Sequence, residues 1–171
     1  MTQMKMIRIE KLTLNIGAGK NPDLLKKGAK LLKAITGVEP VKTVTKKRIP
    51  TWGLRPGLPI GCMLTLRKAK ARNVLGRLLD ARSGKLAQSQ FDQHGNVSFG
   101  VHEYIDIPGV KYDPEIGIIG LQACVTLERP GFRIRRRRIK CKRIPPSHRI
   151  TKDDAVKFME KEFNVSVGEE Q

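Results

Sequence analysis

Apolar residues alternate with polar ones at the start of the chain, and the alternation changes phase once. The apolar positions are Ile7, Ile9, Leu12, Leu14 and Ile16. A period of two is typical of a strand that buries one face, so residues 7–16 are predicted to form a strand. The change of phase predicts a bulge near Lys11, because one extra residue turns the following side chains to the other face.

A helix is predicted after the turn Gly17-Ala18-Gly19. Asn21 is a favourable capping residue, Pro22 fits the first helical turn, and Gly37 is a typical helix end. The expected buried face is Leu24, Gly28, Leu31, Leu32 and Ile35, and the opposite face carries Lys26, Lys27, Lys30 and Lys33. A charged helix face is usually solvated, so contact between these lysines and nucleic acid is the weaker interpretation.

The remaining periodic segments predict three further strands and two further helices. The strands are marked by Ile60, Cys62, Leu64 and Leu66, by Val97, Phe99 and Val101, and by Ile119, Leu121, Ala123, Val125 and Leu127. The helices are marked by Ala71, Val74, Leu75, Leu78 and Leu79, and by Ala155, Met159 and Phe163. The last helix is preceded by Thr151 and Asp154, a variant of the capping box.

Residues 41–59 interrupt this pattern. Pro50, Gly53, Pro56, Gly57 and Pro59 recur every few residues, so we expect a long loop without regular structure. The whole chain, residues 1–171, is therefore predicted to be a single α+β domain. In it a mostly antiparallel sheet packs against helices, and two long basic segments, the loop at 41–59 and an extension at 129–150, are available to RNA.

The positive charge is concentrated in two windows. The chain carries 34 Lys and Arg against 16 Asp and Glu, a formal net charge of +18. Ten of the cations lie between Glu39 and Asp80 and eleven between Glu128 and Asp153, and neither window contains a carboxylate. Outside the windows acidic residues outnumber basic ones, so the positive charge is local, as expected of a surface that binds a polyanion.

Several other classes of protein fit the sequence poorly. Cys62, Cys124 and Cys141 are odd in number and lack the spacing of a zinc or redox pair, so we expect reduced thiols and neither a metal nor a cofactor. No apolar run approaches the roughly 20 residues of a membrane span, and the first residues lack the apolar stretch of a signal peptide. We therefore expect a cytoplasmic protein without a membrane partner.

The densest cluster of cations lies in the basic extension. It consists of Arg133, Arg135, Arg136, Arg137, Arg138, Lys140, Lys142 and Arg143. Guanidinium groups bind phosphate oxygens in a bidentate way, so RNA contact is the favoured interpretation, and a solubilising or targeting role is the alternative. Because like charges repel, we expect the segment to be extended or disordered at low salt until phosphates neutralise it.

A second cluster combines cations with the single tryptophan of the chain. Lys46, Lys47, Arg48 and Arg55 surround Trp52 in the loop at 41–59. An aromatic ring among cations can stack on an exposed nucleotide while the cations hold the backbone. The alternative is that Trp52 anchors the loop to the core, and the sequence leaves both roles open.

The sequence contains no convincing catalytic constellation. Gly17-Ala18-Gly19-Lys20 resembles a phosphate-binding loop but has too few residues between its glycines, and Asn21 follows where Ser or Thr is needed. The carboxylates are dispersed, and neither a His, a Cys nor a Ser occurs in a nucleophile setting. An RNA-modifying enzyme is therefore the weaker alternative, and a polybasic protein at a membrane surface lacks the apolar anchors it would need.

Several long motifs resemble the large-subunit ribosomal protein L-five family over nearly the whole chain. They are Lys11-Leu12-Thr13-Leu14-Asn15-Ile16-Gly17, Pro59-Ile60-Gly61-Cys62 with Thr65-Leu66-Arg67, Gly95-Asn96-Val97-Ser98-Phe99-Gly100, and Ile105-Asp106-Ile107-Pro108-Gly109-Val110-Lys111-Tyr112-Asp113. Arg129-Pro130-Gly131-Phe132 and the arginine run resemble its archaeal and eukaryotic branch, and the archaeal members most closely.

The resemblance implies a structural constituent of the large ribosomal subunit, not an enzyme. Such a protein binds 5S rRNA, attaches it to large-subunit rRNA in the central protuberance, and contacts P-site tRNA. Neighbouring ribosomal proteins of the central protuberance are implied partners, with the small-subunit head as a further candidate.

The resemblance also assigns candidate residues to these contacts. The rRNA candidates are Asn15, Thr65 and Arg67, together with the cations of the basic extension named above. The tRNA candidates are Lys46, Lys47, Arg48, Thr51, Trp52 and Arg55. Two residues depart from the family pattern: Trp52 stands where Phe is common, and Lys68 stands where Gly is expected after Leu-Arg.

Overall fold

Five strands form one antiparallel sheet with β1 (Arg8–Gly17) at its centre. The order is β2-β3-β1-β6-β5, with β2 at Val41–Val44, β3 at Pro59–Leu66, β5 at Val97–Val101 and β6 at Leu121–Glu128. The computed structural model describes residues 3–168. All four strand pairings in this sheet are antiparallel, which confirms the predicted α+β class.

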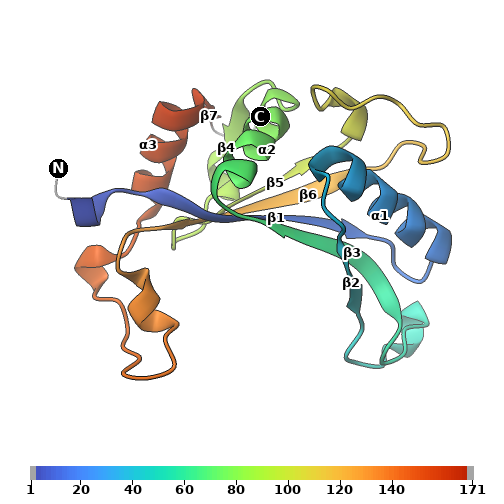
Figure 1. Cartoon of the computed structure of the whole chain (residues 1–171), viewed down its shortest axis with the longest axis horizontal. Helices are drawn as coiled ribbons and strands as arrows, with labels where there is room; N and C mark the ends of the chain where they lie inside the picture. The colour runs from blue at the N-terminus through green and yellow to red at the C-terminus, as the bar shows by residue number, and fades with distance from the viewer. Residues whose placement is uncertain (1–2, 169–171) are drawn as a thin grey trace.

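Three helices cover one face of the sheet and leave the other face open (Figure 1). They are α1 (Pro22–Thr36), α2 (Lys68–Asp80) and α3 (Lys152–Phe163). Their apolar stripes and the inward residues of the strands form one core, in which Leu12, Leu14, Leu31, Leu75 and Met159 are fully buried. A short parallel pair, β4 (Lys85–Ala87) and β7 (Ser166–Gly168), lies apart from the main sheet.

The predicted bulge in β1 is confirmed. The pairing of β1 with β6 shifts register between Ile9, opposite Leu127, and Lys11, opposite Thr126, so Glu10 is the extra residue. The irregularity explains the change of phase in the sequence, since residues on both sides of Glu10 still reach the core.

The predicted helix starts are confirmed at the level of single hydrogen bonds. The side chain of Asn21 accepts from the backbone N–H groups of Asp23 and Leu24, and Pro22 occupies the first turn. Thr151 and Asp154 form the expected reciprocal capping box. One detail differs, because Leu25 is buried in α1 whereas Leu24 is only half-buried.

The expectation that residues 41–59 lack regular structure is wrong for their first part. Val41–Val44 form β2, which pairs with β3 as an edge strand. Four residues are too few to show periodicity, and the strand exists because β3 supplies its hydrogen-bond partners. The parallel pair β4 and β7 was likewise invisible in the sequence, since each strand has only three residues.

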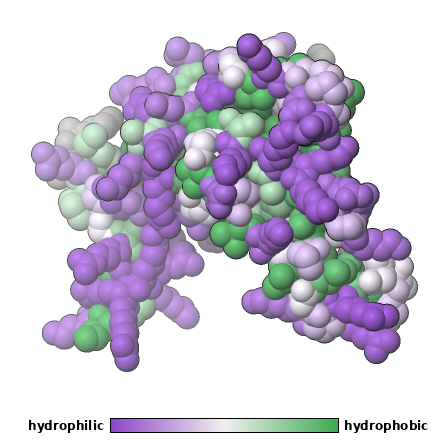
Figure 2. Space-filling view, turned by 45° about the vertical axis from the view of Figure 1, so that its right-hand side comes forward, coloured by the Kyte–Doolittle hydropathy of each residue, from purple (hydrophilic) through white to green (hydrophobic). Residues whose placement is uncertain are grey.

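Two segments project beyond the open face of the sheet. Residues 45–58 descend from the end where β2 and β3 meet, and residues 129–150 descend from the opposite end (Figure 1). Figure 2 shows both projections with a hollow between them, and hydrophilic residues cover most of the left-hand one. The cations of residues 45–58 and those of residues 129–150 therefore stand at opposite ends of one sheet face, whereas the later part of the first basic window, from Arg67 to Arg77, lies at the end of β3 and in α2.

Candidate nucleic-acid interface

The open face of the sheet carries small, mostly polar side chains. Leu12, Leu14 and Ile16 point to the core, so Thr13 and Asn15 take the other face. Cross-strand registers place Met63, Thr65, Gln122, Cys124, Ser98 and Thr126 on that same face. The amide of Asn15 donates to the side-chain oxygen of Gln122 at 3.2 Å. The middle of this face therefore presents mostly hydroxyl and amide groups, and Lys11, opposite Thr126, adds one cation to it.

The predicted rRNA candidates Asn15 and Thr65 lie on this face, on neighbouring strands. Sequence reasoning missed Ser98, Gln122 and Cys124, which β5 and β6 bring to the same surface. Their alternation with core residues was visible in the sequence. What was missing was the strand order, which makes β6 the neighbour of β1 and β5 the neighbour of β6.

Two carboxylates at the end of β1 and β6 hold the base of the basic extension. Arg136 forms ion pairs with both Glu10 and Glu128, the latter at 3.3 Å. Arg8 pairs with Glu128 at 2.8 Å, and Arg67 reaches Glu10 at 3.4 Å. The Glu10 and Glu128 side chains are only 7% and 13% exposed. Arg67 and Arg136, both predicted to bind rRNA, are thus engaged within the protein.

The arginine run is folded in the structure, whereas the sequence predicts an extended or disordered segment at low salt. Phe132–Arg135 form a short 3-10 helix, the Lys142 N–H donates to the Ile134 carbonyl at 3.1 Å, and the Arg137 side chain donates to the Lys140 carbonyl. The reason lies in tertiary structure, since the carboxylates that neutralise Arg136 come from β1 and the end of β6.

Both ends of the extension are tied to α3. The guanidinium of Arg129 donates to the Asp154 carboxylate at 2.8 Å and to the Arg149 carbonyl at 3.1 Å. Burial opposes the ionisation of Asp154, but hydrogen bonds from the Thr151 N–H and hydroxyl, together with Arg129, outweigh it and lower its pKa. The extension is therefore a folded loop with a fixed base.

Most cations of the extension remain free for a partner. Within the described residues, six of them have neither a side-chain hydrogen bond nor an ion pair: Arg133, Arg135, Arg138, Lys140, Lys142 and Arg143. All six are exposed. Unpaired exposed cations at this density repel one another, and a bound polyanion relieves this repulsion, so the surface favours binding of a polyanion.

The opposite projection is also ordered by local hydrogen bonds. Ile49 and Leu54 exchange two backbone bonds of 3.0 Å, and the Thr45 N–H donates to the Leu58 carbonyl at 2.9 Å. Leu54 is buried at 8% exposure, whereas Trp52 is 67% exposed. Leu54 is therefore the buried apolar side chain of this loop, and the exposure of Trp52 argues against the anchoring role considered for it. Trp52 stands at a turn whose neighbouring cations have no acidic partner among residues 3–168.

The lysine face of α1 is partly occupied within the protein. Lys30 pairs with Asp113 at 2.8 Å and with Glu115, and Lys33 pairs with Glu39 at 2.7 Å. The hydrogen bond from Lys30 lowers the pKa of Asp113, and the one from Lys33 lowers the pKa of Glu39. These pairs favour the structural interpretation of the lysine face.

Neither a catalytic nor a metal centre is evident between residues 3 and 168. The buried Cys62 thiol donates to the Leu25 carbonyl, and burial raises its pKa, so it is held in the unreactive form. No group of three or more His, Cys, Asp or Glu side chains in this range is placed to hold a metal ion. Of the helices described, none has the length and apolar composition needed to cross a membrane.

A polar sheet face without a carboxylate in its middle, between two groups of unpaired cations, defines the class as a nucleic-acid-binding scaffold. Comparison with known protein families agrees with this nucleic-acid-binding class. The family model for ribosomal protein L5 matches residues 2–55, and the model for the C-terminus of the same ribosomal family matches residues 59–158. The chain belongs to the ribosomal protein L5 family and is a structural protein, not an enzyme.

Archaeal proteins are similar over almost the full length. The protein named large ribosomal subunit protein uL5 from Nanoarchaeum equitans is 50% identical over 165 residues, which are 96% of this chain and 97% of the relative. Its namesake from Sulfurisphaera tokodaii is 47% identical, covering 97% of this chain and 94% of the relative. That from Methanosphaera stadtmanae is 42% identical, covering 98% and 99%. The resemblance to the archaeal branch is thereby confirmed.

Proposed function

We propose that the chain is a structural constituent of the large subunit of the cytoplasmic ribosome, where it binds 5S rRNA and attaches it to large-subunit rRNA in the central protuberance. The observation that carries the proposal is the polar open sheet face, without a carboxylate in its middle, between two projections rich in unpaired cations. Full-length similarity to archaeal uL5 proteins supports the same assignment.

The chemistry of the open face suits folded RNA. Hydroxyl and amide groups such as those of Thr13, Asn15 and Gln122 can hydrogen-bond to ribose 2′-hydroxyls and to exposed base edges. The middle of the face holds no carboxylate that would repel phosphates, and the flanking cations can neutralise the backbone. We assign 5S rRNA to this face, with Asn15, Thr65 and Arg67 among its contacts.

The basic extension is assigned to rRNA of the large subunit. Its six unpaired cations lie on a folded loop whose base is fixed by Arg136, so they offer phosphates a preformed surface. Arg137 adds its positive charge to this surface, although its Nε donates a hydrogen bond to the Lys140 carbonyl. We also assign neighbouring ribosomal proteins of the central protuberance as partners of the chain, and the small-subunit head as a further candidate partner.

The loop of residues 46–58 is assigned to P-site tRNA. Trp52 is exposed at a turn that hydrogen bonds hold in place, and Lys46, Lys47, Arg48, Thr51 and Arg55 lie in the same loop. A ring presented in this way can stack on a nucleotide with little loss of entropy, while the cations hold phosphates.

The 5S assignment is tested with two carboxylate insertions of equal charge. Thr65→Glu places a carboxylate on the open face, and Asn73→Glu places one on the exposed side of α2, across the sheet. We expect Thr65→Glu to weaken binding to 5S rRNA by about tenfold or more, because a like charge at an interface costs several kcal/mol. Asn73→Glu should change the affinity by less than about threefold. Equal effects of the two variants, both folded by thermal melting, would exclude the open face as the binding surface.

The tRNA assignment is tested on ribosomes that carry Trp52→Ala. Loss of one stacked ring should weaken P-site tRNA binding by roughly tenfold, whereas 5S binding by the free protein should be unchanged. Tyr112→Ala, at another exposed aromatic residue, is the matched control and should leave tRNA binding unaltered. Unchanged tRNA affinity in the Trp52 variant would remove the loop from this role.

A further inference from the structure

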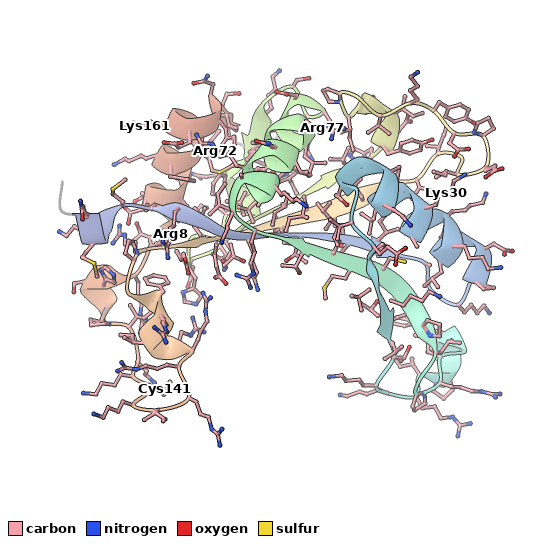
Figure 3. The ribbon with its side chains drawn as sticks, in the orientation of Figure 1. Arg8, Lys30, Arg72, Arg77, Cys141 and Lys161 are labelled. Atoms are coloured by element: carbon pink, nitrogen blue, oxygen red, sulfur yellow. The ribbon has the colours of Figure 1, made fainter. Side chains whose placement is uncertain are left out.

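A cleft of about 570 Å³ lies between the basic extension and the end of the sheet. Its walls come from the sheet end, from the turn at residues 94–96, and from the extension itself, where Cys141 is labelled in Figure 3. This volume is within the range of sites that bind small molecules or single chemical groups of larger partners. It adjoins the open sheet face at Thr126.

The cleft has apolar walls that are packed in place. Ile144 and Ile150 are buried, and Phe132 packs against the core with its ring edge-on to His148 at 5.8 Å between centroids. A Cβ on Gly95 would lie 2.5 Å from Ile150, so the turn and the extension pack as closely as glycine allows. The site is therefore largely preformed.

The rim of the cleft is cationic. Arg135, Lys142 and Arg143 line it, and they are among the six cations without a side-chain partner in residues 3–168. Glu10 is the one carboxylate in the lining, and Arg67 and Arg136 already neutralise it. An occupant of this cleft should thus combine an apolar part with a negative charge.

We propose that the cleft receives one unpaired nucleotide extruded from the RNA bound by this protein. The base would pack against Phe132 and Ile144, and its phosphate would lie among Arg135, Lys142 and Arg143. His94 and Asn96, on the facing wall, supply hydrogen-bonding groups for a base edge. The inference rests on the proposed RNA binding, because only a bound RNA brings the nucleotide to the cleft. An unpaired base is favoured since extruding a paired one costs a few kcal/mol.

Two native cysteines make the cleft and the sheet face separately measurable. Cys141 lines the cleft and Cys124 lies on the open sheet face, both exposed, whereas Cys62 is buried and serves as the unreactive reference. Iodoacetamide alkylation of the full chain is followed by mass spectrometry. The probes are an RNA hairpin with one bulged adenosine, the same hairpin fully paired, and AMP.

The bulged hairpin should protect Cys141 at about tenfold lower concentration than the paired hairpin, as expected for the stacking of one base. Arg143→Gln should abolish this preference. Arg138→Gln is the matched control, because it removes the same charge from the same extension outside the cleft, and it should keep the preference. Both variants should lower the overall affinity for RNA to a similar, small extent.

Three outcomes would overturn the inference: equal protection of Cys141 by the two hairpins, a preference that survives Arg143→Gln, or protection by AMP as strong as by the bulged hairpin. Protection of Cys124 and Cys141 by 5S rRNA is measured in a parallel alkylation reaction. If Cys124 is protected while Cys141 shows no preference for the bulge, the cleft inference fails and the proposed function stands. If 5S rRNA protects neither cysteine, the proposed function itself is contradicted.

Discussion

Replacing Arg136 with alanine tests whether ion pairs hold the base of the basic extension. The guanidinium bridges Glu10 and Glu128, which are almost hidden from solvent, although Arg136 itself is 47% exposed. After the substitution Glu10 keeps Arg67 at 3.4 Å, and Glu128 keeps Arg8 at 2.8 Å. Each carboxylate therefore loses one of two cationic partners.

The expected cost is about 1–2 kcal/mol in the free energy of unfolding. Hydrogen bonds to charged groups contribute roughly 1.5–3 kcal/mol when buried, and the partial exposure of Arg136 reduces this value. For a chain of this size the melting temperature should fall by roughly 2–8 °C. Arg138→Ala, which removes an exposed arginine without a partner, should cost less than about 0.5 kcal/mol.

Thermal melting and urea unfolding of the two variants provide the measurement. A double variant with Glu128→Gln tests the mechanism, because Arg136→Ala should cost at least about 0.5 kcal/mol less once its partner is neutral. The reasoning is refuted if Arg136→Ala and Arg138→Ala melt alike, or if the cost of Arg136→Ala is the same in both backgrounds.

Three further predictions concern acid stability, backbone strain and salt. Lys30 lowers the pKa of Asp113, so their ion pair stabilises the fold at pH values above 3.8, the ordinary pKa of an aspartate. This contribution is lost as the pH falls through the lowered pKa of Asp113. Asp113→Asn should therefore be less stable than the native chain at pH 7 by urea unfolding, and the difference should shrink on acidification towards pH 3. Lys68 has a φ of 57°, so Lys68→Gly should stabilise the protein by about 1 kcal/mol in thermal melts, whereas Lys70→Gly inside α2 should destabilise it. Binding to 5S rRNA should weaken steeply with salt, each single Lys or Arg removal should lower the slope by about one at most, and a nearly flat titration would contradict the electrostatic account.

The elements that the sequence predicted correctly depend on local chemistry. The caps at Asn21 and Thr151 act within three residues, and the alternation in β1, β3, β5 and β6 records which side chains reach the core. The bulge at Glu10 was visible because it changes the phase of that alternation. The expected Gly at position 68 also has a structural basis, since the backbone there is left-handed.

Tertiary structure decided which of these features meet. The sequence showed the arginine run as a window without acids, yet Glu10 and Glu128 reach Arg136 because β1 and β6 are neighbours in the sheet. The sequence left the role of Trp52 open, and only the structure shows that this ring is exposed while Leu54 is buried. Charge and periodicity are properties of single segments and are readable along the chain. Ion pairs, an open sheet face and a cleft need segments distant in sequence, so they exist only once the strand order is set.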